Sequence, residues 1–387
     1  MRASRLPLLF GMLVVALLAP LRAHGQSASA RPALFPMSRD SVAGRIADLQ
    51  RIHTPEGIEV LEPVEVNGST QWISIRGLNR RNPILLVVHG GPGSAMLASS
   101  WAYQKPWEDF FTVVNWDQRA VGKNWNPADT ARLRPTMTGE QHVRDAEMVV
   151  RHVLRRLGQQ KLVLLGWSWG TAFTPVLVQQ HPELFHAWVG MGVTGGGAAG
   201  AGDPLHTRLL EIARANRDTQ ALRELDALAP DRSTLRGIER ALALRKWARI
   251  YDGGWYGKPT LDLFFSLSDW GPEYTTREAE TLIAATQWGA RAITGSPTGS
   301  APPSFRYDVP MFFLMGRYDL HTPYASAKAH FDRIEAPRKR FITFERSAHF
   351  VMLEEPGRFL LTLVNEVLPL AGGARTFDTI TEPQRRR

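Results

Sequence analysis

The chain contains no cysteine among its 387 residues. This absence excludes a disulfide-stapled scaffold, a cysteine-ligated metal site and a catalytic thiol together. Hydrophobic residues make up 44% of the sequence and charged residues 21%, a balance that is typical of a globular protein and not of a disordered or fibrous one. A chain of this length can form one large domain with an insertion, or two domains.

The sequence also lacks a strong excess of one charge outside its two ends. The formal net charge is +9, but residues 1–25 hold three arginines and no acid, and Arg385–Arg387 close the chain. Without these six side chains, 40 basic residues stand against 37 acidic ones, a net charge of +3. A nearly neutral body gives no electrostatic reason to expect a nucleic-acid partner.

The apolar run near the N-terminus is short. Leu6–Leu21 spans sixteen residues, whereas a membrane-spanning helix needs roughly 20. Two arginines precede the run, and small residues follow it at Ala23-His24-Gly25 or at Ala28-Ser29-Ala30. This arrangement is typical of a secretory signal peptide. We therefore predict that residues 1–25 direct export to the periplasm or the exterior, without stable membrane insertion after processing; an uncleaved anchor is the alternative.

Short apolar runs alternate with helical patterns along the rest of the chain. Gly57–Val66 and Gln71–Arg76 predict two strands joined by a turn at Asn67-Gly68. Six more runs suit strands buried on both faces: Ile84–Val88, Phe111–Trp116, Lys161–Leu165, Ala187–Gly190, Met311–Met315 and Phe341–Phe344. The clearest helical patterns are Thr138–Leu157, Ser168–Gln180 and Glu354–Val367. This alternation predicts an α/β fold, a mainly parallel sheet flanked by helices.

One stretch of about a hundred residues breaks the alternation, because it contains no convincing strand. It includes two amphipathic segments, Leu205–Leu228 and Ser233–Tyr251, which predict helices. We expect a helical cap at residues 197–304, inserted into a core of residues 31–196 and 305–387.

The pentapeptide Gly166-Trp167-Ser168-Trp169-Gly170 stands between a predicted buried strand and a predicted helix. Small residues two before and two after the serine permit a tight strand-to-helix turn. That turn lifts the hydroxyl above the sheet and leaves backbone N–H groups at the start of the helix. A chain with 33 glycines can hold such a pentapeptide by chance, so its placement carries the argument. We predict that Ser168 is a nucleophile.

A serine nucleophile needs a base and an orienting acid, which this arrangement places in the order serine, acid, histidine. Asp319 follows the seventh predicted strand, at the edge where ligands bind in open α/β sheets, whereas Asp308 precedes that strand. His349 follows the last predicted strand. His321 and His330 come soon after Asp319, so we expect that neither reaches the position of the base. Asp319 is therefore the predicted orienting acid and His349 the predicted general base.

The segment His89-Gly90-Gly91-Pro92-Gly93 follows the third predicted strand. Glycines let a backbone approach a substrate oxygen and aim an N–H at it. We expect the N–H groups of Gly91 and Trp169 to form an oxyanion hole, with His89 in a structural role. The run Gly190–Gly195 matches G-x-G-x-x-G, but no helix pattern follows it directly, so no dinucleotide is predicted. The sequence predicts no metal site and no cofactor.

These motifs resemble the prolyl iminopeptidase family of α/β-hydrolase fold serine peptidases. The matching segments are His89–Gly93, Asp117-Gln118-Arg119, Asp145-Ala146-Glu147, Ser168-Trp169-Gly170, Gly316-Arg317-Tyr318-Asp319 and Ser347-Ala348-His349. The resemblance covers roughly residues 55–195 and 305–370. It implies an aminopeptidase that releases an N-terminal residue, proline or another small apolar one, from short peptides through an acyl-enzyme. The chain departs from the family at Ala120 and Trp167, where glycine is usual.

The resemblance also implies a cap that supplies carboxylates for the free amine of the substrate. Candidate carboxylates near the aromatic residues of the cap are Asp252, Asp262, Asp269, Glu273, Glu278 and Glu280. We expect at least one of them to face the site. Other readings stay open: an esterase or lactonase on the same scaffold, and a non-catalytic binding protein of this fold. Epoxide hydrolase and dehalogenase chemistry is disfavoured, because it needs a carboxylate where this chain has Ser168. The oligomeric state is left open.

Overall fold

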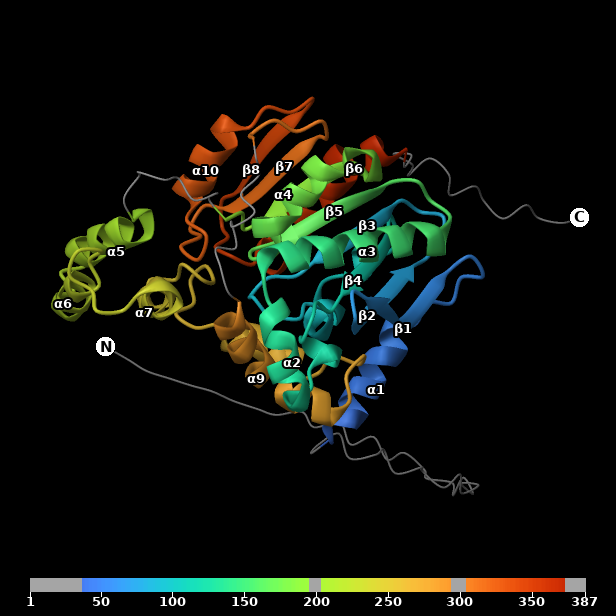
Figure 1. The fold of residues 1–387 in the computed structure, drawn as a ribbon, viewed down its shortest axis with the longest axis horizontal. Coiled ribbons are helices and arrows are strands. Elements are labelled where there is room, and N and C mark those ends of the chain that lie inside the picture. Colours follow the sequence, from blue (N-terminus) through green and yellow to red (C-terminus); the bar gives the residue numbers. More distant parts are fainter. Residues whose placement is uncertain (1–36, 195–202, 294–303, 373–387) are drawn as a thin grey trace, which may run out of the picture. The chain divides into compact units, whose positions relative to one another are not determined.

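Eight strands form one sheet in the order β1-β2-β4-β3-β5-β6-β7-β8 (Figure 1). The strands are β1 (Ile58–Val66), β2 (Ser69–Gly77), β3 (Ile84–Val88), β4 (Thr112–Trp116), β5 (Leu162–Trp167), β6 (Phe185–Met191), β7 (Met311–Gly316) and β8 (Lys339–Phe344). The β1–β2 and β2–β4 pairs are antiparallel, and the other pairs are parallel. Every predicted strand is present with its ends within two residues of the prediction, and the predicted α/β fold is confirmed.

The computed structural model describes residues 37–194, 203–293 and 304–372. From Ser38 onward they belong to one compact unit. The predicted signal peptide at residues 1–25 lies outside the described residues, as does residue 197, where the cap was predicted to begin. Within the described ranges, no helix has both the length and the apolar character that crossing a bilayer requires.

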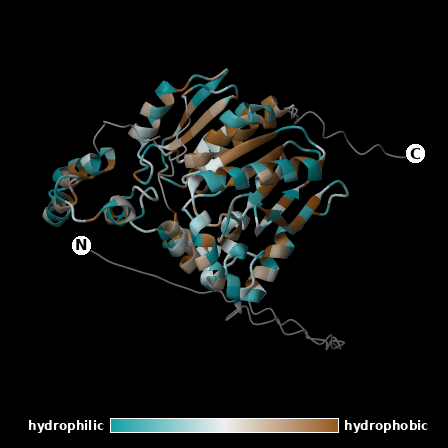
Figure 2. Ribbon diagram, viewed as in Figure 1, coloured by the Kyte–Doolittle hydropathy of each residue, from teal (hydrophilic) through white to brown (hydrophobic). Residues whose placement is uncertain are grey.

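Helices cover both faces of the sheet. On one face, α3 (Gly139–Leu157), α4 (Gly170–Gln180) and α10 (Tyr324–Arg333) pack against strand residues such as Leu86. On the other face, α11 (Val351–Glu354) and α12 (Pro356–Thr362) pack against strand residues such as Leu85. Figure 2 shows strands that are largely apolar (brown) beside helices that carry many hydrophilic residues (teal). Burial on two faces explains why these strands are continuous apolar runs and not alternating ones.

Local signals explain where several helices begin and end. The Thr138 hydroxyl caps α3 by accepting from the N–H of Gln141, and Gly158 ends it in the left-handed region. The predicted helix Glu354–Val367 is wrong as a single element, because α11 ends at Glu354 and α12 begins at Pro356. Proline lacks the N–H that would continue the helix. A π-helical turn at Leu363–Val367 follows α12.

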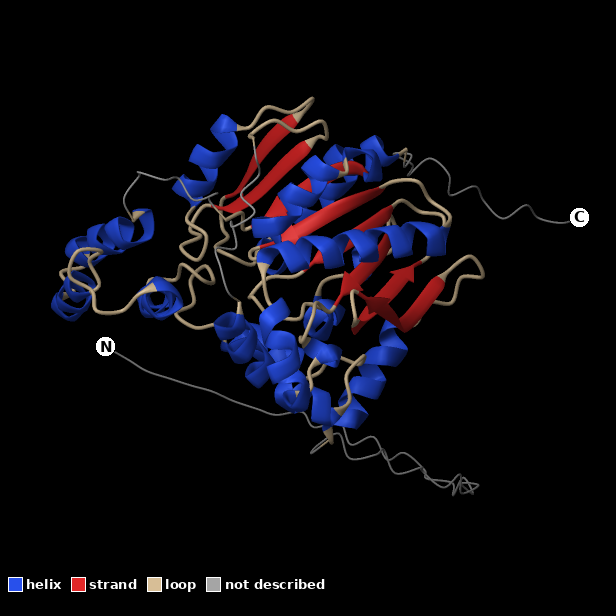
Figure 3. Cartoon of the chain, viewed as in Figure 1, coloured by secondary structure: helices blue, strands red, loops and turns tan. Residues whose placement is uncertain are grey.

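Between β6 and β7 the described residues form helices and add no strand to the sheet (Figure 3). These helices are α5 (Pro204–Ala215), α6 (Thr219–Ala227), α7 (Gly237–Ile250), α8 (Asp262–Ser268) and α9 (Thr276–Ala292). We call residues 203–293 the cap. The predicted single helix Leu205–Leu228 is wrong, because Arg217 has a φ of 54° and Asp218 caps a second helix. The predicted domain boundaries stay predictions.

Two further helices and several short turns complete the described elements. The helices are α1 (Arg39–Gln50) and α2 (Thr130–Leu133). The 3-10 turns are Leu97–Ala102, Lys105–Trp107, Gly122–Asn124, Pro127–Asp129, Arg134–Thr136, Pro182–Leu184 and Leu368–Ala371.

Candidate active site

Ser168 lies on the sharp turn between β5 and α4. Its φ is 50°, in the left-handed region that a residue with a Cβ rarely adopts. The turn is held by the N–H of Ser168, which donates to Met191 O at 2.9 Å. A Cβ on Gly170 would overlap Val88 O, and one on Gly166 would lie 2.9 Å from Thr174 Oγ1. The two glycines are therefore required for the serine to stand in this position.

The loops after β7 and β8 bring Asp319 and His349 together. His349 Nδ1 lies 2.8 Å from Asp319 Oδ2. Because a carboxylate only accepts, Nδ1 donates, and the lone pair of Nε2 is left to accept a proton. Asp319 is further held by the N–H groups of His321 and Thr322, at 2.8 and 2.9 Å, and by the Thr322 hydroxyl at 2.7 Å. Asp319 is 1% exposed and His349 4%, so solvent hardly competes for this bond.

Ser168 and His349 line the same cavity, which has a volume of about 180 Å³. We call it the Ser168 cavity. The Ser168 hydroxyl makes no hydrogen bond with any residue that the structure describes. Hydrogen bonds between nucleophile and base are often long before substrate binds and tighten in the complex. The predicted serine and histidine therefore line one cavity, and the predicted acid lies behind the histidine, already hydrogen-bonded to it.

The glycine segment after β3 passes directly beside the serine. An ideal Cβ on Gly90 would lie 2.9 Å from Ser168 Cβ, and Gly91, with a φ of 116°, lines the Ser168 cavity. Neither the N–H of Gly91 nor that of Trp169 donates to a described residue. Both amides are thus available to an oxyanion on the substrate.

His89 holds the glycine segment against the next loop. Its Nδ1 lies 2.9 Å from Gly90 O, and its Nε2 accepts from the N–H of Gln118 at 3.2 Å. Burial lowers the pKa of His89 to about 4, so the ring is neutral at pH 7. One nitrogen donates and the other accepts, which suits the structural role predicted for this residue.

Trp167 combines packing with a place in the cavity wall. Its Nε1–H donates to His349 O at 3.2 Å. Its ring centroid lies 5.5 Å from that of His349 and 5.4 Å from that of Phe350, and the side chain lines the Ser168 cavity. The glycine expected here from the resemblance has no side chain, so it could make neither the hydrogen bond to His349 O nor the ring contact with His349.

Glu354 is a residue that sequence reasoning missed. Its carboxylate accepts from the N–H groups of Ala348 at 3.0 Å and Phe350 at 2.9 Å, on either side of His349. It also accepts from the N–H of Tyr256 in the cap at 2.6 Å. Burial raises the pKa of Glu354, although the three amide donors act to lower it. An acid in the first turn of α11, directly after the histidine loop, is the capping signal that would have indicated it.

His321 also lines the Ser168 cavity, with its ring centroid 5.2 Å from that of His349. His349, not His321, is the histidine bonded to Asp319, but the loop after Asp319 turns His321 back toward His349, which was not predicted from the sequence. Its Nε2 is buried and has no hydrogen-bond partner in the described part of the chain. Burial, together with the charges of His349, Arg245 and Arg249, holds the pKa of His321 well below its usual value.

Comparison with known proteins places this chain in a family. A model described as the alpha/beta hydrolase fold matches residues 83–356. The chain belongs to the alpha/beta hydrolase fold family. A Bacillus subtilis (strain 168) protein named "Probable aminopeptidase YbaC" is 27% identical over 319 residues, covering 80% of this chain and 96% of that protein. The "Proline iminopeptidase" of Lactobacillus helveticus (strain DPC 4571) is 24% identical over 306 residues, covering 76% and 93%.

A solved structure agrees with the fold of this hydrolase. The proline iminopeptidase-related protein from Thermus thermophilus superposes with a TM-score of 0.51 at 19% identity, covering 81% of this chain and 99% of that one. The similarity supports the fold alone. With the curated relatives, the predicted resemblance to prolyl iminopeptidases is confirmed.

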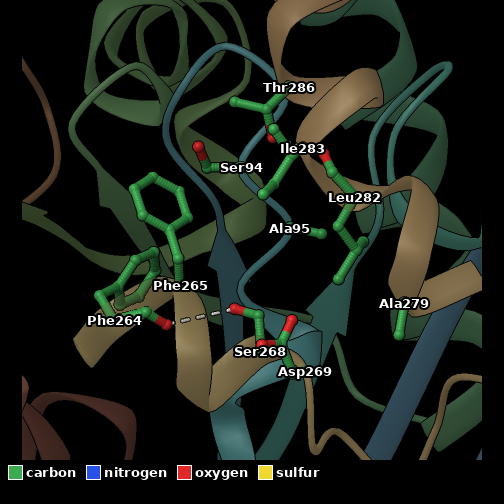
Figure 4. Close-up of a pocket in the computed structure, with 10 residues that line it drawn as sticks. All are labelled: Ser94, Ala95, Phe264, Phe265, Ser268, Asp269, Ala279, Leu282, Ile283 and Thr286. Carbon is green, nitrogen blue, oxygen red and sulfur yellow. Dashed lines mark hydrogen bonds between the residues drawn. The ribbon is translucent and has the colours of Figure 1, made fainter. Parts of the chain in front are cut away.

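The cap carboxylates of this α/β hydrolase lie elsewhere than expected. No described residue that lines the Ser168 cavity is an aspartate or glutamate. Asp252 lines a separate cavity of about 440 Å³. Asp269 lines another of about 30 Å³, shown in Figure 4, where it sits beside Ser268. Glu278 pairs with Lys123 at 2.9 Å. The expectation that at least one cap carboxylate faces the site is therefore not met by the described residues.

The small cavity that contains Asp269 adjoins the Ser168 cavity. The two share Ser94, Phe264 and Phe265 in their walls. Burial raises the pKa of the Asp269 carboxyl, although the charge of Arg39 acts to lower it. Across residues 37–194, 203–293 and 304–372, no three His, Cys, Asp or Glu side chains are grouped so that they could hold a metal ion.

Proposed function

We propose that the protein is a serine hydrolase that cleaves small substrates through an acyl ester of Ser168. In this proposal it acts as an aminopeptidase of the prolyl iminopeptidase type, releasing an N-terminal proline or other small apolar residue from short peptides. The observation that carries the proposal is the arrangement around one cavity: a serine at a left-handed turn, and a histidine bonded to a buried aspartate at 2.8 Å.

The geometry suits acyl transfer in two steps. His349 Nε2 takes the proton of the Ser168 hydroxyl as Oγ attacks the substrate carbonyl carbon. His349 then returns the proton to the leaving amine as the C–N bond breaks. Water, activated by the same nitrogen, hydrolyses the ester. Asp319 keeps Nδ1 protonated and stabilises the imidazolium, while the amides of Gly91 and Trp169 stabilise the oxyanion.

Two observations support small peptides as substrates. The relatives named above carry aminopeptidase and proline iminopeptidase names and match most of this chain. The Ser168 cavity, at about 180 Å³, is below the roughly 300–1,000 Å³ of pockets that hold drug-sized ligands. A folded protein substrate would not fit such a space.

An esterase or lactonase is the second candidate. It is favoured by one feature of the described cavity wall, the lack of a carboxylate that could bind a substrate ammonium group. Desolvating an ammonium without an anion costs several kcal/mol, of which the aromatic rings in the wall, such as Trp167 and Phe264, would offset about 2 kcal/mol or less. The triad chemistry is the same for an ester and an amide, so it does not separate the two candidates.

A fluorophosphonate probe tests the nucleophile. We expect mass spectrometry to find the probe on Ser168 of the wild type and to find no adduct on Ser168→Ala. Ser94 lines the same cavity, so Ser94→Ala is the matched control and should still be labelled at Ser168. Labelling at Ser94, or undiminished turnover by Ser168→Ala, would overturn the assignment.

A substrate panel separates peptidase from esterase. It compares aminoacyl arylamides with free amines, the same compounds after N-acetylation, and short acyl esters. Clear preference for the free amine supports the aminopeptidase. Equal cleavage of free and acetylated substrates, or cleavage of esters alone, supports the esterase.

We also propose that the protein is exported, on the sequence pattern of residues 1–25. The full chain and a chain lacking residues 1–25 should be expressed in bacteria and compared by fractionation. A shortened mature form outside the cytoplasm, seen for the full chain alone, is the expected result; an unprocessed cytoplasmic protein would refute it.

A further inference from the structure

One face of the cap helix α7 lines the Ser168 cavity. Leu242, Arg245 and Arg249 all contribute to the cavity wall, and residues three or four apart on a helix lie on the same face. Among the described residues of the cavity wall, the side chains that can carry a charge are those of Arg245, Arg249, His321 and His349. The wall therefore carries two fixed positive charges and no negative one.

Both of these arginines lack a partner. Neither makes a hydrogen bond or ion pair through its side chain with any residue within the described ranges. Arg240, earlier on the same helix, pairs with Asp203 and donates to Leu228 O at 2.8 Å. Arg240, which is not among the residues that line the cavity, thus has partners for its charge, whereas Arg245 and Arg249, which do line it, have none among the described residues.

The surroundings of Arg245 make its unpaired positive charge energetically unfavourable. Burial lowers the pKa of its guanidinium, and the charge of Asp319 opposes that effect. Asp319, however, is already held by His349, by the Thr322 hydroxyl and by the backbone N–H groups of His321 and Thr322. It forms no ion pair with Arg245. A partly buried charge without a paired counter-charge is unfavourable, and a bound anion would offset that cost.

The positive charges of the two arginines also affect the pKa of His321. Its pKa is held low by burial and by the charges of His349, Arg245 and Arg249. Its buried Nε2 is without a hydrogen-bond partner among the described residues. The Ser168 cavity therefore combines positive charge with a buried polar atom that has no partner in the described part of the chain, and both favour an anionic group.

We propose that Arg245, assisted by Arg249, binds a carboxylate of the substrate in the Ser168 cavity. The enzyme then selects small substrates with a free carboxylate close to the bond that is cleaved. An arginine side chain can hold both oxygens of a carboxylate at once, which gives orientation as well as attraction. The inference rests on the proposed function, because it assigns a specificity to the bond that Ser168 attacks.

Two kinds of small substrate carry such a carboxylate. In a dipeptide it is the C-terminal carboxylate, on the leaving-group side of the amide. In a half-ester of a dicarboxylic acid it is on the acyl side. Two matched pairs separate these sources: alanyl-alanine against its C-terminal amide, and the p-nitrophenyl half-ester of glutaric acid against the p-nitrophenyl ester of butyric acid.

The readout is the ratio of kcat/KM between the carboxylate substrate and its neutral partner. We expect a ratio of at least about ten for one pair in the wild type, equivalent to about 1.4 kcal/mol. Arg245→Met should bring the ratio close to one, whereas Arg245→Lys, which keeps the charge but loses the fork, should keep part of it. Arg214 is an exposed arginine of α5 outside the cavity wall, and Arg214→Met should keep the wild-type ratio.

A wild-type ratio near one for both pairs would overturn the inference while leaving the nucleophile intact. Loss of probe labelling at Ser168 would overturn the proposed function instead. Calorimetry with glutarate and glutaramide on Ser168→Ala decides the carboxylate site without turnover. Binding of glutarate alone, lost when Arg245→Met is added, supports the site; equal binding of both compounds refutes it. If Arg245→Met does not fold, the glutarate–glutaramide comparison and Arg245→Lys still give the answer.

Discussion

Replacing Glu354 should lower the free energy of unfolding and loosen the loop that carries His349. This carboxylate accepts from the backbone N–H groups of Ala348 and Phe350, which flank His349, and from that of Tyr256 in the cap. Two substitutions remove these bonds to different extents. Glu354→Gln keeps one carbonyl oxygen, and Glu354→Ala keeps none.

The magnitude follows from counting the amides that lose an acceptor. A glutamine oxygen can still accept from Ala348 and Phe350, but its NH₂ group then faces the N–H of Tyr256. One unsatisfied amide costs about 1–3 kcal/mol. Because burial raises the pKa of Glu354, a neutral side chain recovers part of that cost, and we expect Glu354→Gln to lose about 1 kcal/mol. Glu354→Ala deprives all three amides, so about 3 kcal/mol or more is expected.

Urea unfolding followed by tryptophan fluorescence at pH 7 measures the loss of stability, and steady-state kinetics measures activity. Glu354→Ala should lower kcat by about tenfold or more, because in the proposed mechanism His349 is the base and small displacements of a catalytic base are costly. Glu366 forms surface pairs with Arg338 and Arg340, and Glu366→Gln is the control, expected to change stability by about 0.5 kcal/mol or less. If Glu354→Ala matched that control in both assays, the reasoning would be refuted.

Three further predictions concern strain, pH and metal. Because Ser168 has a φ of 50°, Ser168→Gly should be about 0.5–1 kcal/mol more stable than Ser168→Ala in denaturant unfolding, both being inactive; Ala172→Gly, inside α4, should instead destabilise by about 1 kcal/mol. Burial raises the pKa of Asp117 from 3.8 to about 6, so the folded state binds the extra proton and stability falls as pH rises from about 4 to 6. Asp117→Asn should lack this fall, on the order of 2–3 kcal/mol, when unfolding is compared at pH 4 and 7, and an equal fall in both proteins would contradict it. Dialysis against EDTA should leave kcat/KM unchanged, since the proposed mechanism uses no metal; a loss restored by added metal would count against that mechanism.

The strands and the serine turn could be predicted from the sequence because their signals are local. A strand buried on both faces must be a short apolar run, as Ile84–Val88 is, so its position is written in consecutive residues. The turn at Ser168 needs glycines at Gly166 and Gly170, where side chains would meet neighbouring strands or helices. The order of Ser168, Asp319 and His349 follows from parallel strands, whose C-terminal ends meet at one edge of the sheet.

The tertiary structure decided the parts of the site that depend on contacts between distant segments. The sequence motifs contain no sign that the loop after Asp319 turns His321 back onto His349, or that Glu354 ties the histidine loop to the cap. The cap shows this most clearly. Six acidic residues near its aromatic cluster favoured a negative site, yet the face of α7 that lines the Ser168 cavity carries Arg245 and Arg249. Helical periodicity indicates which residues share a face, but which face meets the cavity depends on how the cap packs against the core, and that packing is set by contacts far apart in the sequence.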